Sequence, residues 1–469
     1  MRRNGKTNFS TDRDINGVNR FRDCQIKFQN PTPEDLKTLL EIHPEPKSRP
    51  TIIHQHSKYK RKHLMKPNLV TLLLVTLVTT SVSSADDWWQ FRGKGGASST
   101  AAKVPTTFDD QTNIAWKIEM PGKGASSPIV VGDQVVVTCS GGDNQDELYA
   151  VSIDAKTGKR NWTQKFWATG RCFVHPLSAN AAPTPASDGK HIYVFYSSND
   201  LACLDLKGNL VWFRGLAVDH PKSGNDVGMA SSPVVKDGVV VVQVENQGDS
   251  FAMGLDAETG TTIWTQTRAQ EGVWTSPIII EAANTAPMVL LQSKADFDVL
   301  DLKTGQQKFK AEGAVSTISS PAAVNGKVYV PINGTTAYSV SSDGQLQQEW
   351  NSGKLRPASM SSIVHGDNIF TLNRAGALMT YSAADGTEKN KVRVISGSGN
   401  WATPVVAGNH MYVFAQNGQA YVVDLADGEP QIVHEHTFED EVFLGSPAIA
   451  GNALYVRSDK YVWKIAESK

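Results

Sequence analysis

Eight side chains that could bind a ligand stand where the otherwise regular pattern of this chain is interrupted. Six of them belong to three polar segments, 166–182, 219–226 and 245–249, and two are tryptophans that each precede a proline by three residues. Guanidinium and imidazole groups bind anions and carbonyl oxygens, carboxylates bind cations, and indoles stack on flat or apolar groups. The candidate ligand-binding residues are Arg171, His175, His220, Asp226, Glu245, Asp249, Trp274 and Trp401.

These candidates match no known catalytic or metal-binding spacing, so we assign no catalytic residue and no metal ligand. Neither His175 nor His220 has a closely spaced second ligand, and a surface or hydrogen-bonding histidine is the alternative at each position. Glu245 and Asp249 could offer oxygen ligands to calcium, but a calcium loop normally supplies more. The alternative for the three segments is that their side chains cap strand ends in solvent. The two indoles could instead pack under neighbouring loops.

A cassette repeated along the chain must position these residues. Each copy starts with a small residue and Ser or Thr, usually followed by Pro, and the clearest copies end in Asp-x-x-Thr-Gly-x-x-x-Trp, as at 154–162 and 256–264. Eight copies are separated by 57, 48, 44, 44, 42, 41 and 43 residues. A period of about 40–45 residues is typical of four-stranded propeller blades. The sequence therefore predicts an all-β, eight-bladed β-propeller, with anchors at 128, 185, 233, 277, 321, 363, 404 and 447.

The residues that recur in the cassette have structural explanations rather than chemical ones. The Asp can accept hydrogen bonds from the turn between the third and fourth strands, and the Gly can take the positive φ of that turn. The Trp can wedge between neighbouring blades, and the Pro lies where no ladder donor is needed. We assign to structure Asp154, Gly158, Trp162, Asp205, Trp212, Asp256, Gly260, Trp264, Asp301, Gly305, Trp350 and Trp116.

The last cassette predicts how the ring closes. It ends after Val462, Trp463 and Lys464 without a fourth strand. Residues 113–118, ahead of the first cassette, read as that strand, with Trp116 at the Trp position. We therefore expect the N-terminal strand to complete the eighth blade and leave no open edge.

Composition narrows the classes of partner. The chain of 469 residues has 46 basic and 47 acidic residues, so it lacks the excess positive charge expected of a nucleic-acid-binding protein. Its cysteines are Cys24, Cys139, Cys172 and Cys203, and no two have C-x-x-C spacing, which argues against zinc ribbons and redox motifs. One disulfide among the last three cysteines is left open.

The first 85 residues are not expected to be part of the folded domain, and residues 65–85 indicate export. Residues 1–64 are polar and basic without a period, and we expect them to be disordered. They are either an extension upstream of a true start at Met65 or an unusually long n-region. Residues 65–85 read as a signal peptide: Lys66, an apolar run over 69–78, and small residues up to Ala85. The apolar run is too short for a transmembrane anchor, which needs roughly 20 residues. The propeller is expected over 86–469, periplasmic or extracellular and soluble.

The repeated D-x-x-T-G-x-x-x-W pattern resembles the docking motif of pyrrolo-quinoline quinone-like propeller repeats, and the resemblance covers about residues 86–469. Residues 87–93, DWWQFRG, resemble the W-x-x-F-R-G opening of a group of secreted bacterial propellers. This superfamily includes quinoprotein dehydrogenases, which hold a quinone and calcium in the funnel. It also includes non-enzymatic scaffolds, such as the propeller lipoprotein of the outer-membrane barrel-assembly machinery. The fold alone does not choose between them.

The resemblance implies a non-catalytic binding or assembly scaffold of the cell envelope. We expect a monomer without a cofactor or a membrane span, which binds protein or other envelope components and no nucleic acid. A quinone-dependent dehydrogenase with PQQ and calcium is the alternative, although the vicinal Cys-Cys pair of those enzymes is absent. A polysaccharide-active propeller is a third possibility.

Overall fold

The computed structural model describes residues 87–100, 102–373, 375–395 and 400–467. The predicted N-terminal extension (1–64) and signal peptide (65–85) lie outside these residues. In the described part of the chain, no helix has the length and apolar character needed to cross a membrane.

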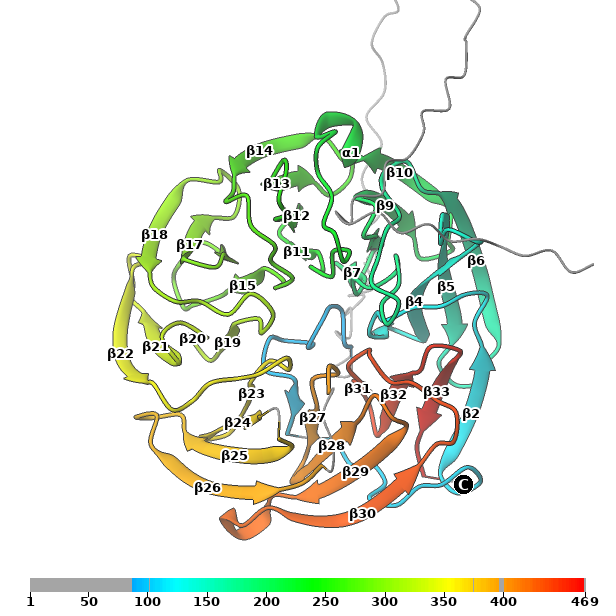
Figure 1. The fold of residues 1–469 in the computed structure, drawn as a ribbon, viewed down its shortest axis with the longest axis vertical. Coiled ribbons are helices and arrows are strands. Elements are labelled where there is room, and N and C mark those ends of the chain that lie inside the picture. Colours follow the sequence, from blue (N-terminus) through cyan, green and yellow to red (C-terminus); the bar gives the residue numbers. More distant parts are fainter. Residues whose placement is uncertain (1–86, 101, 374, 396–399, 468–469) are drawn as a thin grey trace, which may run out of the picture. The chain divides into compact units, whose positions relative to one another are not determined.

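Eight antiparallel four-stranded sheets, here called blades 1–8, surround a central axis (Figure 1). The first strand of each blade is innermost and the fourth is at the rim. Blades 1–4 consist of β3 (Ile129–Val131), β4 (Gln134–Gly141), β5 (Glu147–Asp154), β6 (Arg160–Trp167); β7 (Ala186–Ser187), β8 (His191–Phe195), β9 (Asp200–Asp205), β10 (Leu210–Gly215); β11 (Val234–Lys236), β12 (Val239–Val244), β13 (Phe251–Asp256), β14 (Thr262–Thr267); and β15 (Ile278–Ile280), β16 (Met288–Gln292), β17 (Asp296–Asp301), β18 (Gln307–Glu312).

Blades 5–8 follow the same plan. They consist of β19 (Ala322–Val324), β20 (Lys327–Val330), β21 (Thr335–Val340), β22 (Leu346–Ser352); β23 (Ile363–His365), β24 (Asn368–Leu372), β25 (Ala377–Ser382), β26 (Glu388–Arg393); β27 (Val405–Ala407), β28 (His410–Phe414), β29 (Gln419–Asp424), β30 (Gln431–Thr437); and β31 (Ala448–Ala450), β32 (Ala453–Arg457), β33 (Tyr461–Ile465), β2 (Ile114–Glu119). Short helical turns are α1 (Leu216–Asp219) and η1 (Ala426–Gly428).

The predicted eight-bladed architecture and its closing strand are confirmed. Strand β2 pairs antiparallel with β33, so that Trp116 lies opposite Lys464 and Ile114 opposite Ile465. The two ends of the propeller are thereby joined within blade 8. One element was not predicted: β1 (Ser98–Ser99) adds to blade 7 as a fifth strand, parallel to β27.

The burial of the strands follows from their side chains. Strand β12, with the sequence VVVVQV, is buried along its whole length because it lies between two other strands and between two blades. The outer strand β14 alternates, with Trp264 buried and its neighbours Ile263 and Thr265 exposed. The alternation places one face of each rim strand in solvent and the other against the next blade.

Five tryptophans, here called the wedge tryptophans, cross the junctions between blades. Each donates its indole N–H to a main-chain carbonyl in a turn of the adjoining blade, at distances between 2.9 and 3.3 Å. The donors and acceptors are Trp116 and Ala155, Trp162 and Leu206, Trp212 and Ala257, Trp264 and Leu302, and Trp350 and Ala383. Blade 4 has Phe309 instead, which contacts Phe297 and Tyr338 at 5.8 Å between ring centroids.

The turn glycines have a role that the sequence pattern does not reveal. Their φ values are positive, as the turn requires, but each also lies against a wedge tryptophan. A Cβ atom at these positions would come within 2.5–2.6 Å of the indole ring, closer than any real contact. These glycines are Gly158, Gly208, Gly260, Gly305 and Gly386.

The aspartates of the cassette hold the same turns from within. Asp154, Asp256 and Asp301 each accept the backbone N–H and the hydroxyl of the threonine three residues later. Asp205, in the shorter turn of blade 2, accepts from the side chain and the backbone of Asn209. These hydrogen bonds lower the pKa of Asp154, Asp205 and Asp256 below the ordinary value because they stabilise the ionised carboxylate.

Candidate functional site

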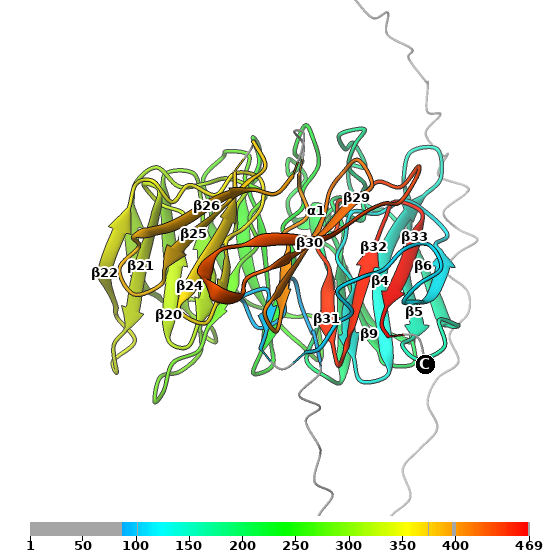
Figure 2. The same cartoon turned by 90° about the horizontal axis from the view of Figure 1, so that it is seen from below.

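The antiparallel order of the blades gives the propeller two different faces (Figure 2). The turns between first and second strands and between third and fourth strands share one face, which we call the turn face. The connections between blades and the turns between second and third strands share the other, which we call the mouth face. All three polar segments, 166–182, 219–226 and 245–249, belong to the mouth face.

The structure brings these three segments together at blades 1–3. Arg171 forms a salt bridge with Asp226 at 3.2 Å, with both side chains largely in solvent. The backbone N–H of His175 donates to Val227 O at 3.0 Å. Asp249 accepts the backbone N–H of Lys222 at 3.0 Å, which ties the second segment to the third. The three segments thus contact one another directly.

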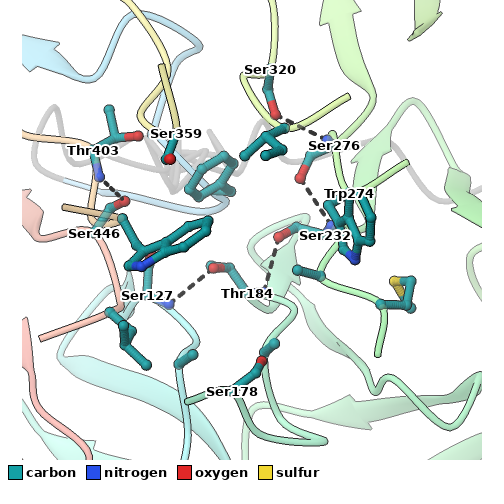
Figure 3. Close-up of a pocket in the computed structure, with 18 of the residues that line it drawn as sticks. Ser127, Ser178, Thr184, Ser232, Trp274, Ser276, Ser320, Ser359, Thr403 and Ser446 are labelled. Carbon is teal, nitrogen blue, oxygen red and sulfur yellow. Dashed lines mark hydrogen bonds between the residues drawn. The ribbon is translucent and has the colours of Figure 1, made fainter. Parts of the chain in front are cut away.

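A series of hydroxyl groups, here called the hydroxyl belt, links the inner ends of successive blades from blade 1 to blade 8. In each link a backbone N–H of one blade donates to a Ser or Thr hydroxyl of the next, at 2.9–3.1 Å. Figure 3 shows the links that do not involve Ser361. The belt runs in order through Ser127, Thr184, Ser232, Ser276, Ser320, Ser361, Thr403 and Ser446.

The belt corrects one anchor of the predicted repeat. The sequence placed the anchor of blade 6 at 363, but the hydroxyl of Ser361 takes the position of Ser320 in blade 5. Ser362 therefore corresponds to Pro321, one residue before the predicted anchor. Because this copy has no proline at that position, its register could not be predicted from the repeat pattern.

Among the described residues, the junction of blades 8 and 1 is held by a buried arginine. Arg457 donates to Ser126 Oγ at 3.1 Å, to the carbonyl of Thr138 and to Cys139 Sγ at 3.4 Å. Its side chain is fully buried. The junction between the first and last blades is thus held by a buried guanidinium group.

Above the belt, the mouth face opens into a cavity of about 370 Å³, here called the funnel. Its wall combines the belt hydroxyls with apolar side chains, among them Leu177, Val227, Ile318 and Leu444. Two of the predicted aromatic residues, Trp274 and Trp401, also line it, together with His175. No Asp, Glu, Lys or Arg occurs among the lining residues that the structure describes.

The N-terminal segment 87–100, here called the plug, closes the channel from the side of the turn face. Trp88 pairs with Val130 of blade 1, and Trp89 O accepts the N–H of Ser187 of blade 2. Arg92 donates to Pro321 O at 2.7 Å and to the carbonyl of Ser362, which belong to blades 5 and 6. Burial lowers the pKa of Arg92 to about 10, so the guanidinium is still protonated at neutral pH.

The plug gives the funnel a floor. Phe91, next to the buried Arg92, is one of the funnel's lining residues. The motif DWWQFRG, noted in the sequence only as a resemblance, therefore forms the plug, a role that the sequence did not predict. No local periodicity marks this segment, because its partners lie hundreds of residues away.

The remaining candidates lie outside the funnel. His220 stacks on Phe251, with ring centroids 3.9 Å apart. Glu245 is buried and forms a salt bridge with Arg268 at 2.8 Å, and it also accepts from Gln243 and Ser293. Burial raises the pKa of Glu245 in spite of these partners. Its carboxylate is thus occupied by protein donors rather than open to calcium.

The cysteines described by the structure, Cys139, Cys172 and Cys203, are free thiols. Burial raises the pKa of Cys172 to about 11 and that of Cys203 to about 12. Both thiols are therefore protonated at neutral pH, which makes them poor nucleophiles. Cys24 lies outside the described residues.

The mouth face also carries exposed apolar side chains, both at the funnel and away from it. Trp401 at the funnel is 44% exposed, and Leu177 and Val227 are also exposed. Farther out lie Phe173 and Trp167, at 58% and 61% exposed. Arg171 lies over the ring of Phe173 at 5.2 Å from its centroid, and Lys165 lies over that of Trp167 at 4.5 Å. Exposed aromatic side chains beside a concave apolar pocket are typical of a binding site for another protein.

The turn face carries a second cavity, of about 810 Å³, beside the plug. Charged residues line it, including Lys94, Glu281, Lys327 and Asp367. None of the eight sequence candidates is among its lining residues.

The chain is similar in sequence to curated proteins of known name. The chain is 26% identical over 232 residues to the outer membrane protein assembly factor BamB of Escherichia coli (strain K12), a match that covers 48% of this chain and 52% of that protein. The BamB of Salmonella typhimurium matches to the same extent. The match thus spans about half the length of these curated relatives.

Solved structures with the same fold come from two functional classes. BamB from Moraxella catarrhalis superposes with a TM-score of 0.54 at 15% identity, over 75% of this chain and 96% of that chain. A europium-containing methanol dehydrogenase superposes with a TM-score of 0.60 at 12% identity, over 79% of this chain and 89% of that chain. At such identities the likeness shows the fold alone.

Sequence similarity decides the family. The family model described as outer membrane protein assembly factor BamB matches residues 99–267 and 249–469, which together make up most of the chain. The match includes all eight blades, and it confirms the resemblance to PQQ-like propellers. The chain belongs to the BamB-like family of PQQ-like β-propellers.

Proposed function

We propose that this protein is an exported, non-catalytic scaffold of the cell envelope that binds a partner protein through its mouth face. The observation that carries the proposal is the uncharged funnel together with exposed aromatic side chains on the same face. Membership of a family named for an assembly factor supports it. The segment 65–85, with the layout of a signal peptide, supports export to the periplasm or beyond.

The charged candidates support a structural role better than a catalytic one. Glu245 is held by Arg268, Asp226 by Arg171, and Asp249 by the backbone of Lys222. General acid–base chemistry needs a titratable group within reach of the substrate. Among the described residues of the funnel lining, His175 is the one side chain of the general acid–base type, and no Asp or Glu accompanies it there.

The dehydrogenase alternative requires a cofactor that the funnel does not suit. Pyrrolo-quinoline quinone carries carboxylates, and calcium takes six to eight oxygen ligands that usually include Asp or Glu side chains. The described funnel lining offers neither a cation for the quinone nor a carboxylate for the metal. Phe91 of the plug fills the floor where a ligand would otherwise sit deepest. These residues do not fit the cofactor.

The polysaccharide-active alternative meets the same difficulty. Most glycoside hydrolases place two carboxylates on either side of the scissile bond. The described lining residues of the funnel include no carboxylate. We therefore retain the scaffold as the proposed function, without a cofactor and without nucleic acid as a partner.

A site-specific photo-crosslinking experiment tests the proposal. A photoreactive amino acid is placed at Phe173 on the mouth face and, as a control, at Val211, which is exposed on rim strand β10. In intact cells of the native host we expect one envelope protein to be crosslinked from Phe173 but not from Val211, and excess unlabelled mature protein should compete with it. Equal labelling from both positions, or calcium-dependent binding of the quinone, would overturn the proposal.

A further inference from the structure

We infer that the funnel is the receptor for an uncharged, apolar loop of a partner protein. In this arrangement the loop's side chains lie against Trp274 and Trp401, and its main-chain carbonyls accept hydrogen bonds from the hydroxyl belt. The inference rests on the proposed function and goes further, because it names the part of the partner that is recognised.

The belt offers hydrogen-bond donors that the propeller itself does not use. From Thr184 to Ser446, seven hydroxyl oxygens accept a backbone N–H, but no acceptor for their own hydrogens occurs among the described residues. Each of these side chains lines the funnel, and the residues are no more than 5% exposed. All of them except Ser361 are labelled in Figure 3. A buried donor without an acceptor is costly, so a site with several is suited to a ligand rich in carbonyl oxygens.

The two tryptophans present ring faces rather than polar edges. Trp274 Nε1 donates to Gly228 O at 2.7 Å, and Trp401 Nε1 donates to Gln416 Oε1 at 3.1 Å. Because both indole N–H groups are satisfied, what remains for a ligand is the apolar ring surface. Apolar and aromatic side chains gain most from such contacts.

The charge of the lining excludes a charged occupant. A carboxylate or ammonium that entered the funnel would lose water without meeting an opposite charge in the described lining. A chain terminus carries a charge, whereas a loop does not. The uncharged lining thus favours a loop over a free end of a polypeptide.

The floor and the rim indicate how the occupant enters. Because the plug closes the far end with Phe91, a segment must enter and leave through the same mouth, as the tip of a loop does. A small molecule could fill about 370 Å³ but would leave Phe173 and Trp167 exposed. A loop in the funnel brings with it a protein body that can cover these two side chains.

Calorimetric titration of the mature chain with designed peptides tests the inference. The probe is a disulfide-closed hairpin, blocked at both ends, with Leu-Phe at its tip, and the matched control has Lys-Glu there. We expect the Leu-Phe hairpin to bind at least about tenfold more tightly than the control. Free N-acetyltryptophanamide should bind at least about tenfold more weakly than the hairpin.

Variants locate the binding in the funnel. Ala230→Trp and Ser359→Trp each add an indole to the lining, at different blades, so that one of them can fail to fold without loss of the test. Each variant whose melting temperature is unchanged should weaken the Leu-Phe hairpin at least about tenfold. Trp401→Ala should weaken it several-fold, whereas Trp167→Ala, exposed on the same face outside the funnel, should have no effect.

The outcomes separate this inference from the proposed function. Equal binding of both hairpins, unchanged binding by a folded funnel-filling variant, or tight binding of N-acetyltryptophanamide would overturn the inference. If crosslinking from Phe173 persists unchanged in Ala230→Trp, the scaffold proposal stands and the funnel is not its receptor. If the Leu-Phe hairpin binds but Phe173 labels no envelope protein, the funnel's preference stands and the scaffold proposal fails.

Discussion

The indole ring of Trp264 packs against Gly305 so closely that a single added methyl group would collide with it at 2.6 Å. The same indole donates to Leu302 O at 2.9 Å, so one side chain of blade 3 holds the turn of blade 4 by shape and by hydrogen bonding. Equivalent pairs recur at four other junctions. The cassette's Trp and Gly are therefore partners across blades rather than within one.

Removal of this wedge should destabilise the propeller. We expect Trp264→Ala to lower the free energy of unfolding by about 3–5 kcal/mol, because a buried aromatic ring is lost and a cavity remains. Urea denaturation followed by fluorescence would measure it. The neighbouring Ile263→Ala, at an exposed position of the same strand, should change stability by only about 0.5 kcal/mol. Similar losses for the two variants would contradict the wedge assignment.

The turn aspartates should make the fold sensitive to acid. The pKa of Asp256 is lowered by the hydroxyl and N–H of Thr259, so its stabilisation is present above the unfolded pKa of about 4 and is lost as the pH falls through the lower, folded value. We expect the melting temperature of Asp256→Asn to fall less than that of the wild type between pH 5 and pH 3. Thr259→Val, which keeps the carboxylate but removes the hydroxyl donor, should give an intermediate slope. Parallel curves for all three proteins would show that this turn does not contribute.

The hydroxyl belt should contribute to stability at the junctions from blade 1 to blade 8 that it links. Ser320→Ala removes the acceptor of the buried Ser276 N–H, and we expect a loss of about 1–3 kcal/mol in the free energy of unfolding. Ser359→Ala, which changes a funnel residue outside the belt, serves as the matched control. If both substitutions cost the same in chemical denaturation, the belt is not a stabilising element.

Removal of the cation from the buried ion network of blades 3 and 4 should destabilise the fold, and the loss of stability should depend on pH. Arg268 bridges Glu245 and Asp298, so Arg268→Met leaves buried carboxylates without a counter-charge and should cost about 3–5 kcal/mol near neutral pH. The pKa of Glu245 is already raised by burial, so its ionisation opposes folding as the pH rises from about 4.3 toward the folded value. Loss of Arg268 should steepen this decline.

Melting temperatures of this variant between pH 4 and pH 8 would reveal the effect. Arg268→Lys, which keeps the charge without the forked donor set, should lie between the wild type and Arg268→Met. A pH-independent loss in Arg268→Met would indicate that packing, not charge, accounts for the arginine.

The plug should be anchored mainly by its arginine. Arg92→Ala removes two charge-assisted hydrogen bonds to carbonyls of blades 5 and 6, and we expect a loss of about 3 kcal/mol in the free energy of unfolding. The exposed Lys94→Ala is the control, with an expected change of about 0.5 kcal/mol. Limited proteolysis should also cut the segment 87–100 faster in Arg92→Ala than in the control.

The parts of the fold that were predictable are those that repeat. The spacing of the cassettes gave the number of blades, and Trp116 marked the closing strand because it matched a position defined by the other copies. The shift at Ser361 and Ser362 shows the limit of this reasoning. Where a copy has lost its proline, nothing local fixes the register, and the hydrogen bond from Ser320 defines it only in three dimensions.

The site was harder to predict because its residues are close in space but have no regular spacing in the sequence. Trp274, Trp401 and His175 do line the funnel. The carboxylate of Glu245, however, binds Arg268, which is 23 residues away and is not marked by any sequence pattern. The hydroxyl belt was not predicted, although its serines and threonines are part of the cassette. They were used only as markers of the repeat, next to the proline. Arg92 reaches partners 229 and 270 residues away, beyond any periodic signal.

The pairing of β2 with β33 has a consequence for the order in which the molecule is made. Residue 114 leaves the ribosome about 350 residues before its partner, Ile465, an interval of roughly 20–70 s at typical elongation rates. Throughout that time the first-made strand must wait without its neighbour, and no intermediate length of chain can form the finished ring. A chain truncated before Tyr461 would have every other blade and still be an open arc.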